Sequence, residues 1–318
     1  MNLCLSVPMH RSSRFFALVV LLCLSVFVVP VLRAATIVDS DQRTLTVVRP
    51  YKRIISLYPA HTTNLLGLGL DQEIIACGAS DTQLPDRPTV HFQDDPERLL
   101  ALKPDLVLIR PMISRGYPHL VRILEQNKVR VVSLQPTTVD EMFAYWRDLG
   151  ILTGREQQAA AMIADFKKQL ADIRASLRHL PPEQQKRVYF ESIHSQMKTF
   201  APNSMAIFVL EAAGGINVAA DAIQVRTTNI AAYGKERLLA KADEIDVYLA
   251  QHGRMNPVSV RDIRTEPGFS VIKAVRQDQI FLVDEALVSR PTMQLLTGIR
   301  FVKSLLYPDY GQAEENRL

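Results

Sequence analysis

The chain has 318 residues, with 37 Lys and Arg against 33 Asp and Glu, and 47% of its residues are hydrophobic. Three of the basic residues (Arg11, Arg14 and Arg33) and none of the acidic ones precede residue 35, so the remainder carries a formal charge of 34 − 33 = +1. This balance gives no support for a nucleic-acid-binding or anionic-membrane-binding protein. The roughly 280 residues that follow suit two domains of ordinary size.

Residues 1–34 are predicted to be a signal peptide. Arg11 and Arg14 precede an apolar run at residues 15–31, and small residues follow at Ala34 and Ala35, which is the order of a secretory signal. The alternative is a membrane anchor, because the run approaches the length that spans a bilayer. We therefore expect a soluble periplasmic protein after cleavage, with the exact cleavage site left open. Only Cys77 lies outside this segment, so no internal disulfide is expected.

The first half of the remaining chain alternates short β-branched runs with helical patterns. The runs lie at residues 53–57, 73–77, 106–109 and 129–134, and helical spacing appears at residues 62–69, 96–102 and 117–126. Short apolar runs separated by helices favour a parallel sheet covered by helices on both faces.

The second half repeats this alternation after one long helical stretch. Strands are predicted at residues 187–191, 245–250 and 279–283, and helices at 206–214, 233–242 and 292–306. Residues 153–180 have no glycine after Gly154 and no proline, which predicts one long helix. A helix between lobes permits only small relative motion.

The predicted fold is therefore two α/β lobes, each with a mainly parallel central sheet, joined by one long α-helix, with a ligand cleft between the lobes. The expected divisions are a signal peptide at 1–34, an N-terminal lobe at 35–150, a linking helix at 151–182 and a C-terminal lobe at 183–318. No cofactor is expected.

Catalytic signatures are missing from the sequence. Gly67-Leu68-Gly69 lies at the end of a predicted helix, whereas a phosphate-binding turn must lie between a strand and the start of a helix. There is no Gly-x-Ser-x-Gly, Walker or His-Glu-x-x-His motif. The sequence therefore favours a binding protein over an enzyme.

Candidate ligand-binding residues follow the predicted strands, because open α/β lobes bind ligands beyond the carboxyl ends of their strands. They are His, Met, Tyr, Arg and similar polar side chains from both halves. The set is Tyr58, His61, His91, Arg110, Met112, Arg115, His194, Met197, Lys198, Arg226, Asn229, His252 and Arg290, with Phe92 and Met255 beside them.

The four histidines of this set have two readings. Each by itself is most simply a hydrogen-bonded loop residue. Together, His61, His91, His194 and His252 are candidates for axial ligation of a chelated metal or haem, or for direct metal binding. The sequence gives no firm metal site. The arginines could recognise carboxylate, phosphate or catecholate oxygens.

Three segments carry a family resemblance: RIISLYPAHTTNLLGLGL, DDPERLLALKPDLVLIRP and LGILTGREQQAA. From about Arg53 to the end of the 292–306 helix, the chain resembles the iron-chelate and vitamin B12 periplasmic-binding family. The resemblance implies a two-lobed protein with a rigid helical backbone, acting as a monomer. Such a protein delivers a corrinoid, ferric siderophore or haem to an ABC permease dimer with its cytoplasmic ATPase.

The resemblance also implies a docking role for Glu97 and Glu236. Members of the family use one exposed glutamate on each lobe to engage arginines of the permease, and these two residues occupy the matching positions, each in a Glu-Arg-Leu-Leu-Ala segment. A simpler reading is that an acidic residue is favoured near a helix N-terminus.

The ligand stays open at this point. Cobalamin-binding members sandwich their ligand between aromatic side chains, whereas Trp146, the only tryptophan, precedes the linking helix. The favoured ligands are a corrinoid or a ferric siderophore. The alternatives are a receptor for haem or a transition-metal ion and, from another class, a periplasmic metal-chelate enzyme.

Overall fold

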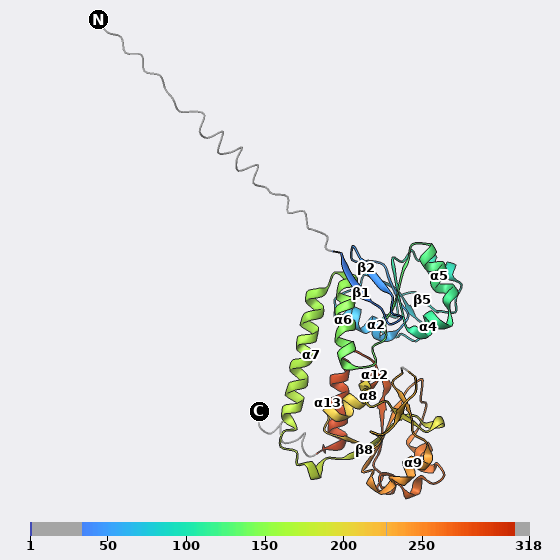
Figure 1. Ribbon diagram of the computed structural model, residues 1–318, viewed down its shortest axis with the longest axis vertical. Helices are drawn as coiled ribbons and strands as arrows, with labels where there is room; N and C mark the ends of the chain where they lie inside the picture. The colour runs from blue at the N-terminus through green and yellow to red at the C-terminus, as the bar shows by residue number, and fades with distance from the viewer. Residues whose placement is uncertain (2–33, 227, 309–318) are drawn as a thin grey trace. The chain divides into compact units, whose positions relative to one another are not determined.

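The computed structural model describes Met1, residues 34–226 and residues 228–308. The predicted signal peptide therefore falls outside the described residues, apart from its two end positions. The described residues from Ala35 onward form one compact unit, which holds two α/β lobes (Figure 1). None of the described helices has both the length and the apolar character needed to cross a membrane.

The N-terminal lobe is built on a five-stranded parallel sheet with the order β5-β4-β3-β6-β7. Its strands are β3 (Ile54–Ser56), β4 (Ile74–Gly78), β5 (Thr89–Val90), β6 (Leu106–Ile109) and β7 (Arg130–Ser133). Strands β3 and β6 are buried along their whole length, as expected for a sheet covered on both faces. A separate antiparallel hairpin, β1 (Ala35–Val38) and β2 (Thr44–Val47), precedes the sheet and was not predicted from the sequence.

Proline and side-chain caps define the helices of this lobe. The helices are α2 (Pro59–Gly67), α3 (Pro96–Ala101), α4 (Pro111–Gly116), α5 (Pro118–Gln126) and α6 (Val139–Thr153). The first four have proline in the first turn, where the missing N–H costs nothing. Helix α6 begins with a capping box, in which Thr138 and Glu141 exchange side-chain-to-backbone hydrogen bonds. The sequence predicted neither α4 nor α6.

The long helix α7 (Glu156–Ser176) is shorter than the predicted 153–180. Thr153 belongs to α6, which ends at Gly154 in the left-handed conformation with φ of 68°. A Cβ on Gly154 would lie 2.7 Å from Cγ of Pro50, so both the backbone angle and the neighbour favour glycine here. The start of the predicted linker is thus a sharp turn between two packed helices.

The C-terminal lobe has a seven-stranded mixed sheet with the order β11-β12-β9-β8-β13-β14, in which β10 also pairs with β8. The strands are β8 (Arg187–Ile193), β9 (Lys198–Phe200), β10 (Ile216–Asn217), β11 (Ile223–Gln224), β12 (Ile230–Ala232), β13 (Val247–His252) and β14 (Ile280–Asp284). The helices are α8 (Met205–Ala212), α9 (Lys235–Ala240), α10 (Val260–Thr265), α11 (Lys273–Arg276), α12 (Glu285–Val288) and α13 (Gln294–Leu306).

The prediction of a mainly parallel sheet needs correction in this lobe. Strands β10, β8, β13 and β14 pair in parallel, but β9, β11 and β12 pair antiparallel. A short 3₁₀ turn at His194–Gln196 is followed by Met197 with φ of 49°, and this left-handed residue turns β9 back along β8. The sequence gives only a weak signal for such a turn, since methionine rarely adopts that conformation.

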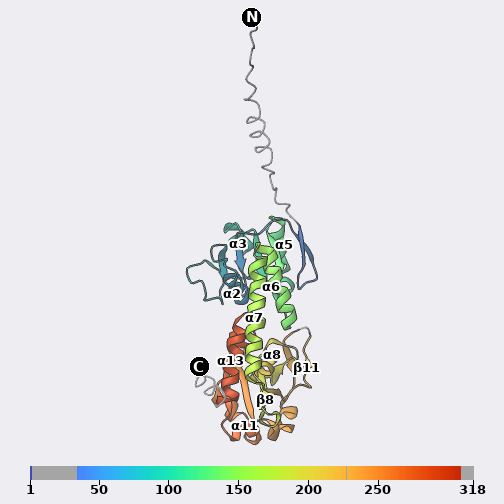
Figure 2. The same cartoon turned by 90° about the vertical axis from the view of Figure 1, so that its left-hand side faces the viewer.

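One hydrophobic core runs through both lobes. It contains residues of the hairpin, the N-terminal sheet, α6, α7, α8, β8, β13 and α13. At its centre the rings of Phe143, Trp146, Phe166 and Phe208 contact one another with centroids 5.5 to 6.4 Å apart. Figures 1 and 2 agree that α7 runs beside α6 and α13. The linking helix is therefore packed on both lobes along its length.

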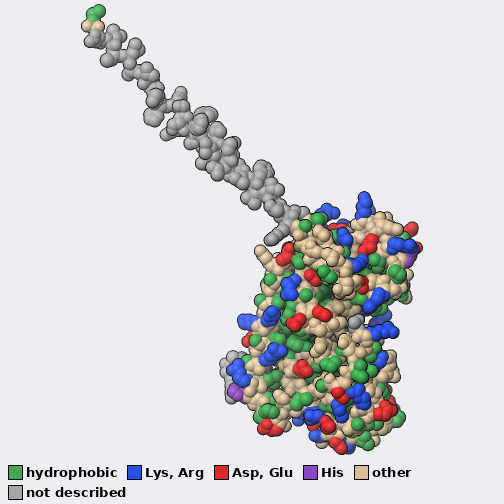
Figure 3. Space-filling model, viewed as in Figure 1, with side chains coloured by type: hydrophobic (Ala, Val, Ile, Leu, Met, Phe, Trp, Pro, Cys, Tyr) green, Lys and Arg blue, Asp and Glu red, His purple; other side chains and the backbone are tan. Residues whose placement is uncertain are grey.

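Charges are mixed over the face drawn in Figure 3, where Lys and Arg side chains alternate with Asp and Glu. This face has no broad region of one sign. Ion pairs such as Arg43–Glu125 and Arg98–Asp94 join opposite charges at the surface of the molecule.

Candidate ligand-binding cleft

A cavity of about 410 Å³ lies between the two lobes. The N-terminal lobe lines it with residues that follow β3, β4 and β6, and the C-terminal lobe with residues at the ends of β13 and β14 and in α12. The polar lining residues are Tyr58, Ser80, His91, Arg110, Gln135, Asn229, Gln251, Arg254, Glu285, Ser289 and Arg290. This is the location expected for a ligand in open α/β lobes, and the volume is typical of a small-molecule site.

Positive charge exceeds negative charge in this cavity. Arg110 comes from the N-terminal lobe, Arg254 and Arg290 come from the C-terminal lobe, and Glu285 is the one carboxylate in the lining. Arg290 Nη2 donates to Glu285 Oε1 at 3.0 Å, and this carboxylate offsets one of the three positive charges. The lining keeps a net excess of positive charge, which favours an anionic ligand.

Tyr58 forms a flat support beneath Arg110. The guanidinium lies 4.4 Å from the centroid of the Tyr58 ring, within the range of a cation–π contact. Burial raises the pKa of Tyr58, and the nearby Arg110 and Arg290 oppose that shift only in part, so the phenol stays protonated at neutral pH. Arg110 Nε is buried and has no acceptor within the described part of the chain.

Apolar side chains complete the lining. Met112 and Met255, one from each lobe, are 47% and 51% exposed although both are hydrophobic. Phe92 packs against His91 with ring centroids 4.1 Å apart and the rings tilted by 32°. Flexible thioethers adapt to irregular apolar surfaces, so this part of the cleft suits an organic ligand rather than a hydrated ion.

Three of the four predicted histidines lie outside the cavity, and two of these, His61 and His194, are held in hydrogen-bond networks. His61 is fully buried, and its ring nitrogens contact Tyr145 Oη at 2.7 Å and the Ile109 carbonyl at 3.1 Å. Burial lowers the pKa of His61 to about 3, so its imidazole is neutral. Both nitrogens are occupied by protein groups, which leaves none for a ligand.

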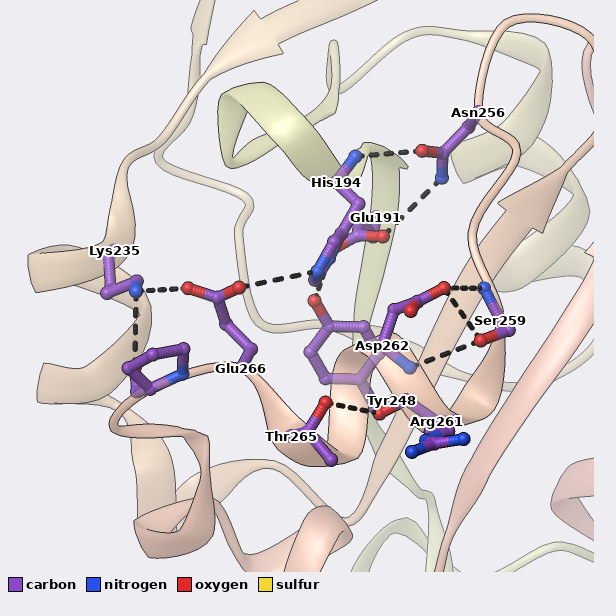
Figure 4. Close-up of polar contacts among 11 residues, drawn as sticks. Glu191, His194, Lys235, Tyr248, Asn256, Ser259, Arg261, Asp262, Thr265 and Glu266 are labelled. Atoms are coloured by element: carbon purple, nitrogen blue, oxygen red, sulfur yellow. Dashed lines mark hydrogen bonds and ion pairs between the residues drawn. The ribbon is translucent and has the colours of Figure 1, made fainter.

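His194 lies between two carboxylates in the C-terminal lobe (Figure 4). Its Nδ1 donates to Glu191 Oε2 at 2.8 Å, and its Nε2 is 3.6 Å from Glu266 Oε2. Glu191 is itself fully buried and also accepts from the Tyr248 hydroxyl. Glu266 forms an ion pair with Lys235. The hydrogen bond to Glu191 raises the pKa of His194, which favours the charged imidazolium over a metal ligand.

No metal centre forms among the described residues, since no three His, Cys, Asp or Glu side chains converge there. His61, His91, His194 and His252 lie in separate environments. His91 Nδ1 accepts from Gln93 N at 3.2 Å, and His252 Nδ1 donates to the Val258 carbonyl at 2.9 Å. The hypothesis that these four histidines together bind a metal ion is therefore wrong.

Comparison with known proteins agrees with this architecture. Residues 54–287, well over half of the chain, match the model of a family described as periplasmic binding protein. The chain belongs to the periplasmic binding protein family. It is a substrate-binding protein, as the sequence predicted, and the alternative of a metal-chelate enzyme is not supported because the family and its relatives are binding proteins.

The individual relatives share only a minority of their residues with this chain. The uncharacterized ABC transporter substrate-binding lipoprotein YvrC of Bacillus subtilis is 24% identical over 281 residues, which is 86% of each chain. The vitamin B12-binding protein of Pectobacterium atrosepticum is 31% identical over 130 residues, 38% of this chain and 45% of that protein. A possible iron-binding periplasmic protein from Staphylococcus epidermidis has the same fold, with a TM-score of 0.70 and 24% identity over 81% of this chain and all of that one.

Six of the predicted ligand-binding residues line the cavity of this binding protein, and seven do not. The six are Tyr58, His91, Arg110, Met112, Asn229 and Arg290. Besides His61 and His194, the others are Arg115, Met197, Lys198, Arg226 and His252. Arg115 lies in α4 and bonds to the Pro111 carbonyl, and Met197 packs against the core of its own lobe. Binding roles for the five residues other than His61 and His194 stay predictions.

Sequence reasoning missed Gln251, Arg254, Glu285 and Ser289. Gln251 lies inside β13, so a search limited to residues that follow a strand does not find it. Its amide oxygen accepts a hydrogen bond from the Ser289 hydroxyl. Glu285 begins the four-residue helix α12, whose sequence signal is limited to the N-cap residue Asp284. Arg254 follows β13 by two residues, so the search for residues after a strand could have found it.

Glu97 and Glu236 occupy equivalent positions on the two lobes of the binding protein. Each is exposed and lies in the first turn of a six-residue helix, α3 (PERLLA) or α9 (KERLLA). Glu97 N donates to Oδ1 of the capping residue Asp95 at 3.0 Å. The carboxylates of both glutamates form no ion pair within the described chain, which leaves them available to a partner.

Proposed function

We propose that this protein captures a metal chelate in the periplasm and delivers it to the permease of an ABC importer. The observation that carries the proposal is the cavity between the lobes, which combines three arginines, one glutamate and exposed methionines. YvrC, which matches along 86% of the chain, is described as an ABC transporter substrate-binding protein. This supports the same role here.

The favoured ligand is a corrinoid or a ferric siderophore. Such chelates present an apolar organic shell with acidic or carbonyl oxygens at its edge, and Met112, Met255 and Phe92 offer apolar contacts while the arginines offer donors. The vitamin B12-binding relative supports the corrinoid. The excess of arginine supports an anionic chelate. A free metal ion has no ligand set among the described residues.

A titration panel tests this proposal. The purified protein is titrated with cyanocobalamin, a ferric hydroxamate, a ferric tris-catecholate, haemin and ferric chloride, and binding is followed by calorimetry. We expect one of the organic chelates to bind with a Kd of about 1 μM or tighter and free Fe³⁺ not to bind. Arg110→Ala should weaken the interaction at least about tenfold, because truncating one partner of a desolvated charge pair is costly. Binding of the free ion alone would contradict the proposal.

Glu97 and Glu236 are proposed to dock the permease, with the protein acting as a monomer toward the permease dimer and its ATPase. A carboxylate in a first helical turn is stabilised by the backbone dipole while it stays exposed, so it can meet an arginine without a large desolvation cost. The two helices share one sequence pattern, which supports a shared role.

The docking test separates transport from ligand binding. In a Glu97→Arg, Glu236→Arg double variant, chelate affinity and the melting temperature should stay unchanged because both residues are exposed. Uptake through the cognate permease should be lost through like-charge repulsion. Glu156→Arg, a charge reversal at an exposed carboxylate in the first turn of α7, is the matched control and should leave uptake intact. Full uptake in the double variant would remove the docking role.

Export with removal of residues 1–34 is part of the same proposal. The order of basic, apolar and small residues in that segment supports it. N-terminal sequencing of protein from the periplasmic fraction should begin near Ala35. A protein that keeps Met1, or that needs detergent for extraction, would instead be anchored.

A further inference from the structure

A buried hydrogen-bond chain runs behind the cleft and joins the two lobes. One end is the carbonyl of Ile109, the residue before Arg110, and the other is the carbonyl of Pro291, the residue after Arg290. Between them lie three buried side chains, those of His61, Tyr145 and Asn64, which are 0%, 3% and 1% exposed. This series of hydrogen bonds thus connects the backbone next to Arg110 in one lobe to the backbone next to Arg290 in the other.

The direction of each hydrogen bond is determined. A carbonyl only accepts, so His61 Nε2 carries the ring proton and donates to Ile109 O at 3.1 Å. The ring is neutral, so Nδ1 accepts from the Tyr145 hydroxyl at 2.7 Å. The Tyr145 oxygen accepts from Asn64 Nδ2 at 3.2 Å, and the same nitrogen donates to Pro291 O at 3.0 Å. The two protons of Asn64 Nδ2 go to these two acceptors, and every other donor of the network has one acceptor, which leaves a single low-energy arrangement.

Two further contacts reinforce both ends. Trp146 Nε1 donates to Pro291 O at 3.2 Å, so that carbonyl is held by two side chains of the N-terminal lobe. His61 also packs edge-on against Tyr58, with ring centroids 5.2 Å apart, and Tyr58 supports Arg110. The side chains that hold the lobes together therefore also lie beside Arg110 and Arg290, two of the three arginines of the cavity.

We propose that His61, Asn64 and Tyr145 are positioning residues, which fix the separation of Arg110 and Arg290 and so select an anionic chelate whose acidic groups match that separation. The inference rests on the proposed function and names the ligand class for the same cleft. A guanidinium binds an oxyanion through two directed bonds, which weaken quickly when the group is displaced. A fixed spacing between two such groups therefore discriminates between ligands.

Tyr145→Phe tests this proposal, because it removes the hydroxyl that joins His61 to Asn64 and keeps the ring. Affinity is measured for two anionic probes, haemin and a ferric tris-catecholate. We expect Tyr145→Phe to bind the tighter of the two about tenfold more weakly, the loss typical of a charge-assisted hydrogen bond. Thr153→Val is the matched control: it removes another buried hydroxyl of α6, which donates to Leu149 O, and should leave affinity unchanged.

A second variant keeps the test valid if Tyr145→Phe does not fold. Asn64→Ala breaks the same chain at the next member, and circular dichroism and the melting temperature report whether each variant is folded. If Tyr145→Phe fails to fold, the folded Asn64→Ala protein must show the same loss of affinity. Unchanged affinity in a folded variant of either residue overturns the proposal.

A double-mutant comparison separates positioning from a general structural role. In an Arg110→Lys, Arg290→Lys background, the flexible ammonium groups keep the charge but no longer depend on a fixed backbone. Tyr145→Phe should then change affinity less than about twofold. A tenfold loss in this background would mean that Tyr145 acts on the whole cleft, and the proposal would be wrong. If the wild-type protein binds no chelate of the panel, the proposed function fails as well. If it binds cyanocobalamin alone, only this inference fails.

Discussion

At the scale of single residues, His194 shows how a histidine at a strand end is used for structure. The side chain bridges the buried Glu191 and the partly exposed Glu266, and Asp262 adds a further negative charge nearby (Figure 4). A proton on the ring therefore compensates carboxylates that folding has partly removed from water. The same network holds Asn256, whose Oδ1 accepts from His194 N at 2.9 Å, next to the cavity residue Met255.

The raised pKa of His194 predicts a pH-dependent stability. Because the folded-state pKa lies above the usual value near 6.5, the stabilisation is fully present below about pH 6.5 and is lost as pH rises through the folded-state pKa. The urea midpoint of the wild-type protein should thus fall between about pH 6 and pH 9. His194→Gln should show a flatter dependence over this range, and His119→Gln, on an exposed face of α5, should follow the wild type. Equal slopes in all three proteins would contradict this role.

At the scale of elements, the α6–α7 corner depends on a glycine inside a helix. Gly150 is buried in α6, and a Cβ there would lie 2.9 Å from Ala159 Cβ and 3.2 Å from the Arg155 carbonyl. Ordinary helix propensity would favour alanine at this position. The close approach of α7 explains why glycine stands there instead.

Gly150→Ala should therefore destabilise the protein. Overpacking of this kind costs about 1–3 kcal/mol, which outweighs the gain of roughly 1 kcal/mol in helix propensity. Gly116→Ala in α4 is the control, since a Cβ there meets nothing within 4 Å, and its effect should stay within about 0.5 kcal/mol. Free energies of unfolding from urea titrations check both. A stabilised Gly150→Ala protein would show that α7 can move away from α6.

The elements also show what a sequence reveals. The runs at 106–109 and 129–134 became buried parallel strands, because β-branched residues apolar on both faces fit only a covered sheet. Helix α6 was not predicted, although Thr138 and Glu141 form a capping box at its start. His61 was assigned to the cleft because it follows β3, but α2 begins at Pro59 and turns the side chain into the interior. Strand-end rules locate a loop without giving side-chain directions.

At the scale of the whole molecule, the lobes are not independent bodies on a hinge. The core around Trp146 and Phe166 continues from one sheet to the other, and the Pro291 carbonyl accepts hydrogen bonds from two residues of the N-terminal lobe. Opening the cleft widely would expose this core and break those bonds. Binding should therefore require only small adjustments between the lobes.

Solution scattering checks this expectation. Curves measured with and without a saturating chelate from the titration panel should be nearly superimposable, because α7 packs on both lobes. Tryptophan fluorescence tests the same expectation, since Trp146 is the sole tryptophan and is buried at the junction of the lobes. Its emission maximum should stay unchanged when the chelate binds. A marked compaction on binding would mean that the two lobes move relative to one another at their junction.

The shared core also determines when the chain can complete its folding. Helix α13 supplies Leu295, Ile299 and Val302 to the core that α6 and α7 contribute to, although about 130 residues separate Ile163 in α7 from Leu295. A polypeptide that emerges N-terminus first cannot close its centre until α13 has arrived. A chain threaded through a narrow export channel would stay loosely structured, and hence easy to thread, until almost all of it had crossed.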